Sequence, residues 1–165
     1  MLEVEVKARC QDLTEKLDKI GASYVKTEVQ EDTYYTHPNR DFRKTDEALR
    51  IRRIKDSCYL TYKGPLQDSD TKTREELEYE VSEGVGEILS KLGFMEYRSV
   101  RKTRRLYKLE GLEICLDDVE GLGSFIEVES KSLLDKERIF NVLERLGVPR
   151  KECTTRTYLD LLEEA

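Results

Sequence analysis

The chain has 165 residues, of which 29 are basic and 35 are acidic, so its formal net charge is −6. This length is typical of one domain that buries enough apolar surface to fold without disulfides or a structural metal. The single histidine, His37, excludes zinc sites and triads that need several histidines. The negative charge argues against a nucleic-acid partner, because a phosphate backbone would be repelled overall.

The chain shows no sign of export or of a membrane segment. No stretch approaches the ~18 apolar residues of a membrane span, and the first residues lack the basic-then-apolar pattern of a signal peptide. Because no Cys-x-x-Cys pair occurs, four reduced thiols are expected at Cys10, Cys58, Cys115 and Cys153. We therefore expect a cytoplasmic protein without a membrane partner. No linker interrupts the chain, which predicts a single domain over residues 1–165.

The first part of the chain predicts two strands separated by a helix. Apolar and polar residues alternate over 2–9, which predicts a strand. Asp12 then caps a short helix that ends at Gly21. The β-branched and aromatic residues of 23–36 predict a long strand. The polar stretch 37–47 predicts a loop.

The middle of the chain predicts a hairpin, a loop, a strand and a helix. Residues 48–54 and 58–63 are two short strand-like runs around a polar turn, which predicts a β-hairpin. The polar stretch 64–73 predicts a mobile loop. A strand is predicted over 74–81, and the following helix ends at Gly93.

The last part of the chain predicts three strands, over 95–108, 112–119 and 124–130, and then an amphipathic helix that ends at Gly147. The C-terminal TYLDLLEEA predicts a short closing helix. Eight strands with interspersed helices predict an α+β fold, an eight-stranded antiparallel β-barrel with helices packed on the outside. A barrel of eight strands can enclose one small ligand.

Most of the predicted strands carry ionised groups on one face and apolar groups on the other. Side chains two residues apart share a face of a strand, about 6.6 Å apart. In the first strand, Glu3, Glu5 and Lys7 share one face, whereas the intervening residues are apolar. The same alternation places further groups on such faces: Arg50 and Arg52; Thr61 and Lys63; Glu76, Glu78 and Glu80; Lys102 and Arg104; Glu113, Cys115 and Asp117; Glu127 and Glu129.

These ionised faces have two interpretations. For any one strand, the simpler interpretation is that the face meets water while helices cover the apolar face. Two like charges about 6.6 Å apart repel by ~0.6 kcal/mol in water, but by ~2.5 kcal/mol in a cleft with an effective dielectric constant of ~20. An enclosed face would therefore need a compensating ion. Because same-sign pairs recur on strand after strand, we favour a hydrated tunnel inside the barrel.

A tunnel with this lining suits a polyanion together with a divalent cation. Arginines donate two hydrogen bonds at once to phosphate oxygens, and carboxylates offer hard oxygens to Mg²⁺ or Mn²⁺. A triphosphate carries about four negative charges, which such a set can neutralise. The candidate triphosphate-binding residues are Lys7, Arg50, Arg52, Lys63, Lys102 and Arg104. The candidate metal ligands are Glu3, Glu5, Asp117, Glu127 and Glu129.

These residues resemble the signature of the CYTH superfamily, the triphosphate tunnel metalloenzymes. Glu3-Val-Glu5-Val-Lys7 is similar to the ExExK motif of that family, and the resemblance covers nearly the whole chain. The resemblance implies an eight-stranded tunnel that binds a triphosphate with Mg²⁺ or Mn²⁺, and it also implies a homodimer. The further matching segments are LRIR (49–52), TYKGP (61–65), REELE (74–78), KTR (102–104), LDDVEGLG (116–123), FIEVE (125–129) and YLDLL (158–162).

The resemblance also implies roles for individual residues. The five candidate metal ligands match the metal-binding positions of the family, and all the candidate triphosphate-binding residues except Lys102 match its phosphate-binding positions. Glu78 matches a further acidic position, whose role stays open. A C-terminal lysine of the family has three alternative counterparts, which are Arg150, Lys151 and Arg156.

Two reactions fit these residues, and the QEDTY (30–34) and TYKGP segments resemble class IV adenylyl cyclase-like members. A cyclase would activate the ribose 3′-hydroxyl of ATP through a metal on Glu5 and Glu129, with Lys63 and Arg104 stabilising the leaving pyrophosphate. The alternative is a triphosphatase that hydrolyses tripolyphosphate, a nucleoside triphosphate or thiamine triphosphate. A non-enzymatic sensor would not need all five carboxylates. Candidate adenine contacts are Phe42 and Tyr35.

Overall fold

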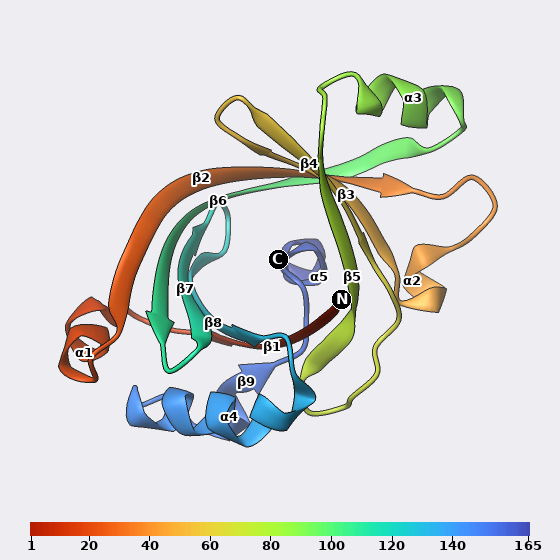
Figure 1. Ribbon diagram of the computed structural model, residues 1–165. Helices are drawn as coiled ribbons and strands as arrows, with labels where there is room; N and C mark the ends of the chain where they lie inside the picture. The colour runs from red at the N-terminus through yellow and green to blue at the C-terminus, as the bar shows by residue number, and fades with distance from the viewer.

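Nine strands form one sheet, and its eight long strands close into a barrel that Figure 1 shows roughly along its axis. The computed structural model describes all residues, 1–165. The strands are β1 (Leu2–Arg9), β2 (Ser23–Thr36), β3 (Ala48–Ile54), β4 (Ser57–Lys63), β5 (Lys72–Val81), β6 (Met95–Leu109), β7 (Leu112–Val119), β8 (Gly123–Ser130) and β9 (Cys153–Thr154). The helices are α1 (Thr14–Lys19), α2 (Phe42–Thr45), α3 (Val85–Lys91), α4 (Lys136–Arg145) and α5 (Tyr158–Glu164), with 3-10 turns at Leu133–Asp135 and Arg150–Glu152. None of these helices combines the length and the apolar character that crossing a bilayer requires.

The first strand closes the barrel. The order of strands is β5-β4-β3-β2-β6-β7-β8-β1, and every neighbouring pair is antiparallel. One edge of β1 pairs with β8, and the other edge pairs first with β5, where Glu3 lies opposite Arg74. The same edge then pairs with the short β9. The predicted eight-stranded antiparallel barrel is confirmed, and β9 is an addition to it.

The largest apolar core lies outside the barrel wall. The outward faces of β1, β6, β7 and β8 pack there against α1 and α4. On β1, Val4 and Val6 belong to this core, as the alternation predicted. On α4, Ile139 and Leu143 project into it and are fully buried. A smaller cluster beneath α3 includes Leu89. Since the helices cover the apolar faces of these strands, their polar faces are left to point inward.

Leu143→Ala is expected to lower the free energy of unfolding by about 2–5 kcal/mol, because it leaves a cavity in a close-packed core. Leu143 has no exposed surface. The matched control is Leu134→Ala, since Leu134 is 94% exposed and its truncation should change the free energy by less than about 0.5 kcal/mol. Urea denaturation of both variants tests the expectation, and equal midpoints would contradict the assignment of this core.

Two predicted loops hold more structure than expected. The stretch 37–47 contains the single-turn helix α2, which Asp41 caps by accepting a hydrogen bond from the backbone. Within 64–73, Thr71 and Thr73 are buried in the barrel wall. There β5 begins two residues earlier than the predicted strand, because β1 pairs with it. The prediction of a mobile loop is therefore wrong for the end of this stretch.

The last helix, α5, departs from the expectation that helices pack on the outside. Figure 1 shows it within the outline of the ring of strands, and Tyr158 and Leu159 line the same cavity as the inner faces of the strands. It packs against apolar residues of β6, β7 and β8, namely Val100, Val119 and Phe125. The predicted closing helix thus lies against the lumen, whereas α1, α3 and α4 lie outside.

Candidate active site

The inward faces of all eight barrel strands line one cavity of about 930 Å³. Glu5, Arg52 and Glu129, from three different strands, all face this cavity. Among the predicted site residues, every one except Asp117 lines it, and the Asp117 side chain lies behind Arg104 with no exposed surface. The lining contains 11 basic and 13 acidic side chains. The ionised strand faces therefore converge on a common lumen of mixed charge.

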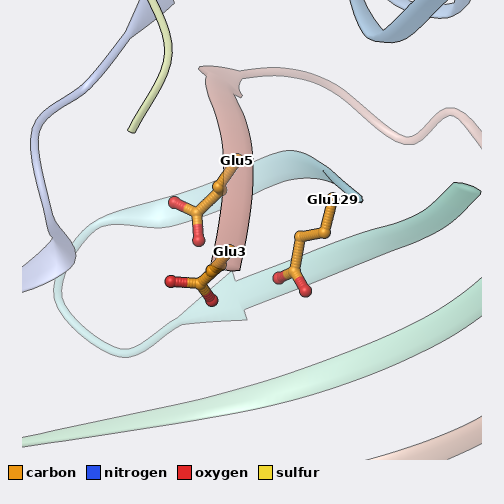
Figure 2. Close-up of side chains that lie close together, drawn as sticks. All are labelled: Glu3, Glu5 and Glu129. Atoms are coloured by element: carbon orange, nitrogen blue, oxygen red, sulfur yellow. The ribbon is translucent and has the colours of Figure 1, made fainter. Parts of the chain in front are cut away.

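Three carboxylates meet on the wall formed by β1 and β8. Glu3 and Glu5 are two residues apart on the inner face of β1, and Glu129 lies directly opposite Glu5 on β8. One carboxylate oxygen from each residue lies within 4.8 Å of the other two (Figure 2). The fold thus brings together three of the five predicted metal ligands.

The crowding of these carboxylates fits a divalent cation. Burial raises the pKa of Glu129 to about 8; Arg104 opposes this effect, whereas neighbouring carboxylates, above all Glu3, add to it. Lys63 Nζ donates to both oxygens of Glu3, at 2.7 and 2.8 Å, so part of the negative charge is already offset. Hard carboxylate oxygens are the ligands that Mg²⁺ and Mn²⁺ prefer, and a bound cation would stabilise the ionised form of each. The donor set therefore fits a hard divalent metal.

The other two predicted metal ligands, Asp117 and Glu127, lie among the cations. Arg104 donates from Nε and Nη2 to the two oxygens of Asp117, at 2.7 and 2.6 Å, and it also pairs with Glu127. Lys7 Nζ bridges Glu127 and Glu5 at 2.9 and 2.8 Å. Burial raises the pKa of Asp117 and Glu127, but the adjacent cations outweigh it and hold both pKa values below the usual range. These contacts orient the cations, and the metal-binding role of the two residues stays a prediction.

A buried carboxylate that the sequence analysis missed holds the two arginines of β3. Asp32 on β2 accepts hydrogen bonds from Nε and Nη2 of Arg52, both at 2.7 Å, and lies 3.8 Å from Nη1 of Arg50. Burial disfavours the charged carboxylate, but Arg50 and Arg52 hold the pKa of Asp32 below its usual range. Glu78 accepts from Thr61 Oγ1 at 2.7 Å and from Arg50 Nη2 at 3.3 Å. The alternation along β2 was the signal that could have placed Asp32 inside.

Tyr158, the first residue of α5, is a second site residue that was not predicted from the sequence. Its ring centroid lies 4.4 Å from Lys7 Nζ and 4.8 Å from Lys102 Nζ, distances typical of cation–π contacts. Its hydroxyl donates to Asp117 Oδ2 at 2.8 Å. No local pattern indicated this role, because it depends on how the tail folds back against the barrel.

Three buried side-chain atoms in the protein have no hydrogen-bond partner: Gln30 Oε1, Arg50 Nε and Arg74 Nε. All three residues line the cavity. Buried polar groups are almost always hydrogen-bonded in folded proteins. The two arginine Nε atoms need hydrogen-bond acceptors, and Gln30 Oε1 needs a donor. A ligand in the cavity, or ordered water in its place, would supply both.

One part of the cavity wall is aromatic. His37, Phe42 and Tyr97 line it, and the His37 ring packs against Phe42 and Phe94 with centroid distances of 5.6 and 5.2 Å. The candidate adenine contacts Phe42 and Tyr35 both face the cavity. Aromatic rings of this kind can stack against a flat heterocycle.

The sequence is similar to two curated proteins over almost its full length. A Methanocaldococcus jannaschii protein named "Putative adenylate cyclase" is 42% identical, and the match covers 98% of this chain and 98% of that relative. The adenylate cyclase CyaB of Aeromonas hydrophila is 25% identical, over 99% of this chain and 90% of that relative.

Solved structures share the same architecture. The PH1819 protein of Pyrococcus horikoshii is 44% identical, with a TM-score of 0.89 over 98% of both chains. The HpAC1 protein of Hippeastrum, a "putative adenylyl cyclase" described as having a dominant triphosphatase activity, shares the fold at 19% identity, with a TM-score of 0.73 over 99% of this chain and 95% of that one. The profile of the CYTH domain matches residues 1–158. The chain belongs to the CYTH family.

Proposed function

We propose that the protein is a Mg²⁺- or Mn²⁺-dependent enzyme that converts ATP to cyclic AMP and pyrophosphate, as a class IV adenylyl cyclase does. The observation that carries the proposal is a single lumen in which buried lysines and arginines lie beside a cluster of three carboxylates. The name of the M. jannaschii relative agrees with this reaction. The aromatic wall around His37 and Phe42 favours a nucleotide over a bare polyphosphate, because a polyphosphate offers nothing to stack there.

In the proposed reaction, the ribose 3′-hydroxyl releases its proton to solvent, and its oxygen attacks the α-phosphorus while the bond to pyrophosphate breaks. Arg50, Arg52 and Arg104 would hold phosphate oxygens through the N–H donors that their carboxylate partners leave free. Lys63 would neutralise charge on the departing pyrophosphate. A divalent cation held by Glu3, Glu5 and Glu129 would supply Lewis-acid chemistry that makes the ribose 3′-hydroxyl more acidic. The buried carboxylates Asp32 and Asp117 keep the arginines in place before the substrate arrives.

Removal of divalent metal is expected to weaken triphosphate binding by at least ~10-fold. The lining contains 11 basic and 13 acidic side chains, so it has no surplus of positive charge to offset the about four negative charges of a triphosphate. Calorimetric titration with a non-hydrolysable ATP analogue, in excess Mn²⁺ and in EDTA, measures the difference. Equal affinities in the two buffers would contradict the proposed metal dependence.

A triphosphatase is the second candidate function, and the description of the Hippeastrum protein supports it. The same cations would hold the substrate while a water molecule attacks the terminal phosphorus, and the bond to the bridging oxygen breaks to release orthophosphate and the remaining diphosphate. The two reactions need the same charges and differ in which phosphorus faces the nucleophile.

Product identification separates the candidates. The purified protein is incubated with ATP, tripolyphosphate or thiamine triphosphate in the presence of Mg²⁺ or Mn²⁺, and the products are resolved by ³¹P NMR and chromatography. Cyclic AMP with pyrophosphate supports the cyclase. Orthophosphate without cyclic nucleotide overturns it in favour of the triphosphatase, and binding without turnover of any substrate would indicate a sensor.

A further inference from the structure

Arg74 is a buried cation without a partner. Eight lysines and arginines are buried in the protein, and seven of them form an ion pair with at least one carboxylate. Arg74 is 5% exposed, forms no ion pair, and its Nε has no hydrogen-bond partner. The paired residues are Lys7, Arg50, Arg52, Lys63, Lys72, Lys102 and Arg104.

The fold places the Arg74 side chain inside the tunnel, next to the three-carboxylate cluster. Arg74 lies on the inner face of β5, directly opposite Glu3 of β1, and it lines the cavity. The carboxylates nearest along these strands are already engaged, because Lys63 Nζ binds Glu3 at 2.7 Å and Glu76 at 3.1 Å. Arg74 is thus left to face the lumen.

A guanidinium does not lose its proton in a protein, so burial cannot neutralise Arg74. Removing such a charge from water without a counter-ion is strongly unfavourable. A second buried cation, Lys72, lies two residues away on the same strand. Burial lowers the pKa of Lys72, and the positive charge of Arg74 lowers it further. The Arg74 guanidinium, which no carboxylate of the protein pairs with, is therefore free to bind an anion from outside the protein.

We propose that Arg74 binds a phosphoryl oxygen of the triphosphate, on the side of the lumen formed by Glu3 and Lys63. This inference rests on the proposed function and adds a seventh cation to the six predicted from the sequence. A residue that only supported the fold would pair with a carboxylate, as Lys72, which does not line the cavity, does with Asp46 at 3.1 Å. The planar guanidinium can donate two parallel hydrogen bonds to a phosphate, whereas a lysine offers one point charge.

The test is the affinity of Arg74→Gln and Arg74→Lys for a non-hydrolysable ATP analogue with Mn²⁺, and the KM and kcat of each with ATP. Arg74→Gln is expected to raise the Kd of the analogue and the KM by at least ~10-fold, and Arg74→Lys to recover part of that loss. Because the substitution removes an uncompensated buried charge, the ligand-free thermal midpoint of Arg74→Gln should equal or exceed that of the wild type. The matched control is Arg53→Gln, which removes an exposed charge from the same barrel and should change neither constant.

The outcomes separate this inference from the function on which it rests. If the wild type binds the analogue and Arg74→Gln binds it equally well, the role of Arg74 is overturned while the proposed function stands. A lowered thermal midpoint with unchanged Kd would assign Arg74 to the fold and would overturn the inference in the same way. If the wild type binds neither the analogue nor pyrophosphate in the presence of Mn²⁺, both the proposed function and this inference fail.

Discussion

Glu5→Ala is expected to reduce turnover of ATP by more than ~100-fold while the protein stays folded. The substitution removes one of three carboxylates that converge on a common point, and the loss of residues that merely support a metal ligand already lowers activity by about 10–100-fold. The barrel should tolerate the change, because Lys7 keeps its ion pair with Glu127 at 2.9 Å. The removal also relieves repulsion among Glu3, Glu5 and Glu129. Steady-state rates with Mn²⁺ and a thermal unfolding curve measure the two effects.

The matched control for this variant is Glu75→Ala. Glu75 lies on β5 with its side chain exposed, so its loss changes the net charge by the same amount without altering the lumen. Its turnover should equal that of the wild type. A Glu5→Ala protein that turns over at the wild-type rate would show that the three-carboxylate cluster does not hold the metal.

Arg104→Gln is expected to lower the free energy of unfolding by about 3–5 kcal/mol and to abolish measurable turnover. Arg104 is the cation shared by Asp117 and Glu127, and its removal leaves buried Asp117 with only the more distant Lys102, at 3.4 Å, as a cationic partner. Turnover falls because Arg104 would no longer donate hydrogen bonds to the negative charge that develops in the transition state. Denaturant unfolding at neutral pH measures the first effect, with Arg101→Gln as control. Arg101 lies on the exposed face of β6, where an ion pair contributes at most about 1 kcal/mol.

The difference in free energy of unfolding between the wild type and Arg104→Gln should depend on pH, which the same denaturant experiment can measure. In the wild type, the pKa values of Asp117 and Glu127 lie below their ordinary values of 3.8 and 4.5. Their ionised forms therefore stabilise the folded state above those values, and this stabilisation disappears as the pH falls through the lowered ones. The stability gap between wild type and Arg104→Gln should be largest near neutral pH and should shrink below pH 4. A gap that is the same at both pH values would contradict the ion-pair assignment.

The barrel could be predicted from local alternation because each strand sorts its own side chains. Glu3 and Val4 point to opposite faces whichever strand lies beside them, so the inner and outer faces of β1 followed from the sequence alone. The burial of Thr71 and Thr73 could not be predicted in that way. The burial of Thr73 results from its pairing with Val4 of β1, a contact that the polar composition of this stretch does not reveal.

The site was predicted less completely than the fold, because ion pairs depend on the register between strands. Asp32 holds Arg52 since the two residues lie opposite each other on β2 and β3. The register also explains why only three of the five predicted metal ligands lie together, while the other two pair with cations. Asp117 lies opposite Arg104 on β6, whereas Glu129 lies opposite Glu5. The location of Tyr158 depends on the path of the tail, which no strand pattern encodes.

The most direct test of the central claim is a crystal structure of the protein with Mn²⁺ and a non-hydrolysable ATP analogue. The anomalous signal of manganese should lie within coordination distance of Glu3, Glu5 and Glu129, about 2.0–2.3 Å from their oxygens. The triphosphate should lie in the lumen with its oxygens on Arg50, Arg52 and Arg104. Manganese and nucleotide bound on the outer surface, with the lumen holding only water, would contradict it.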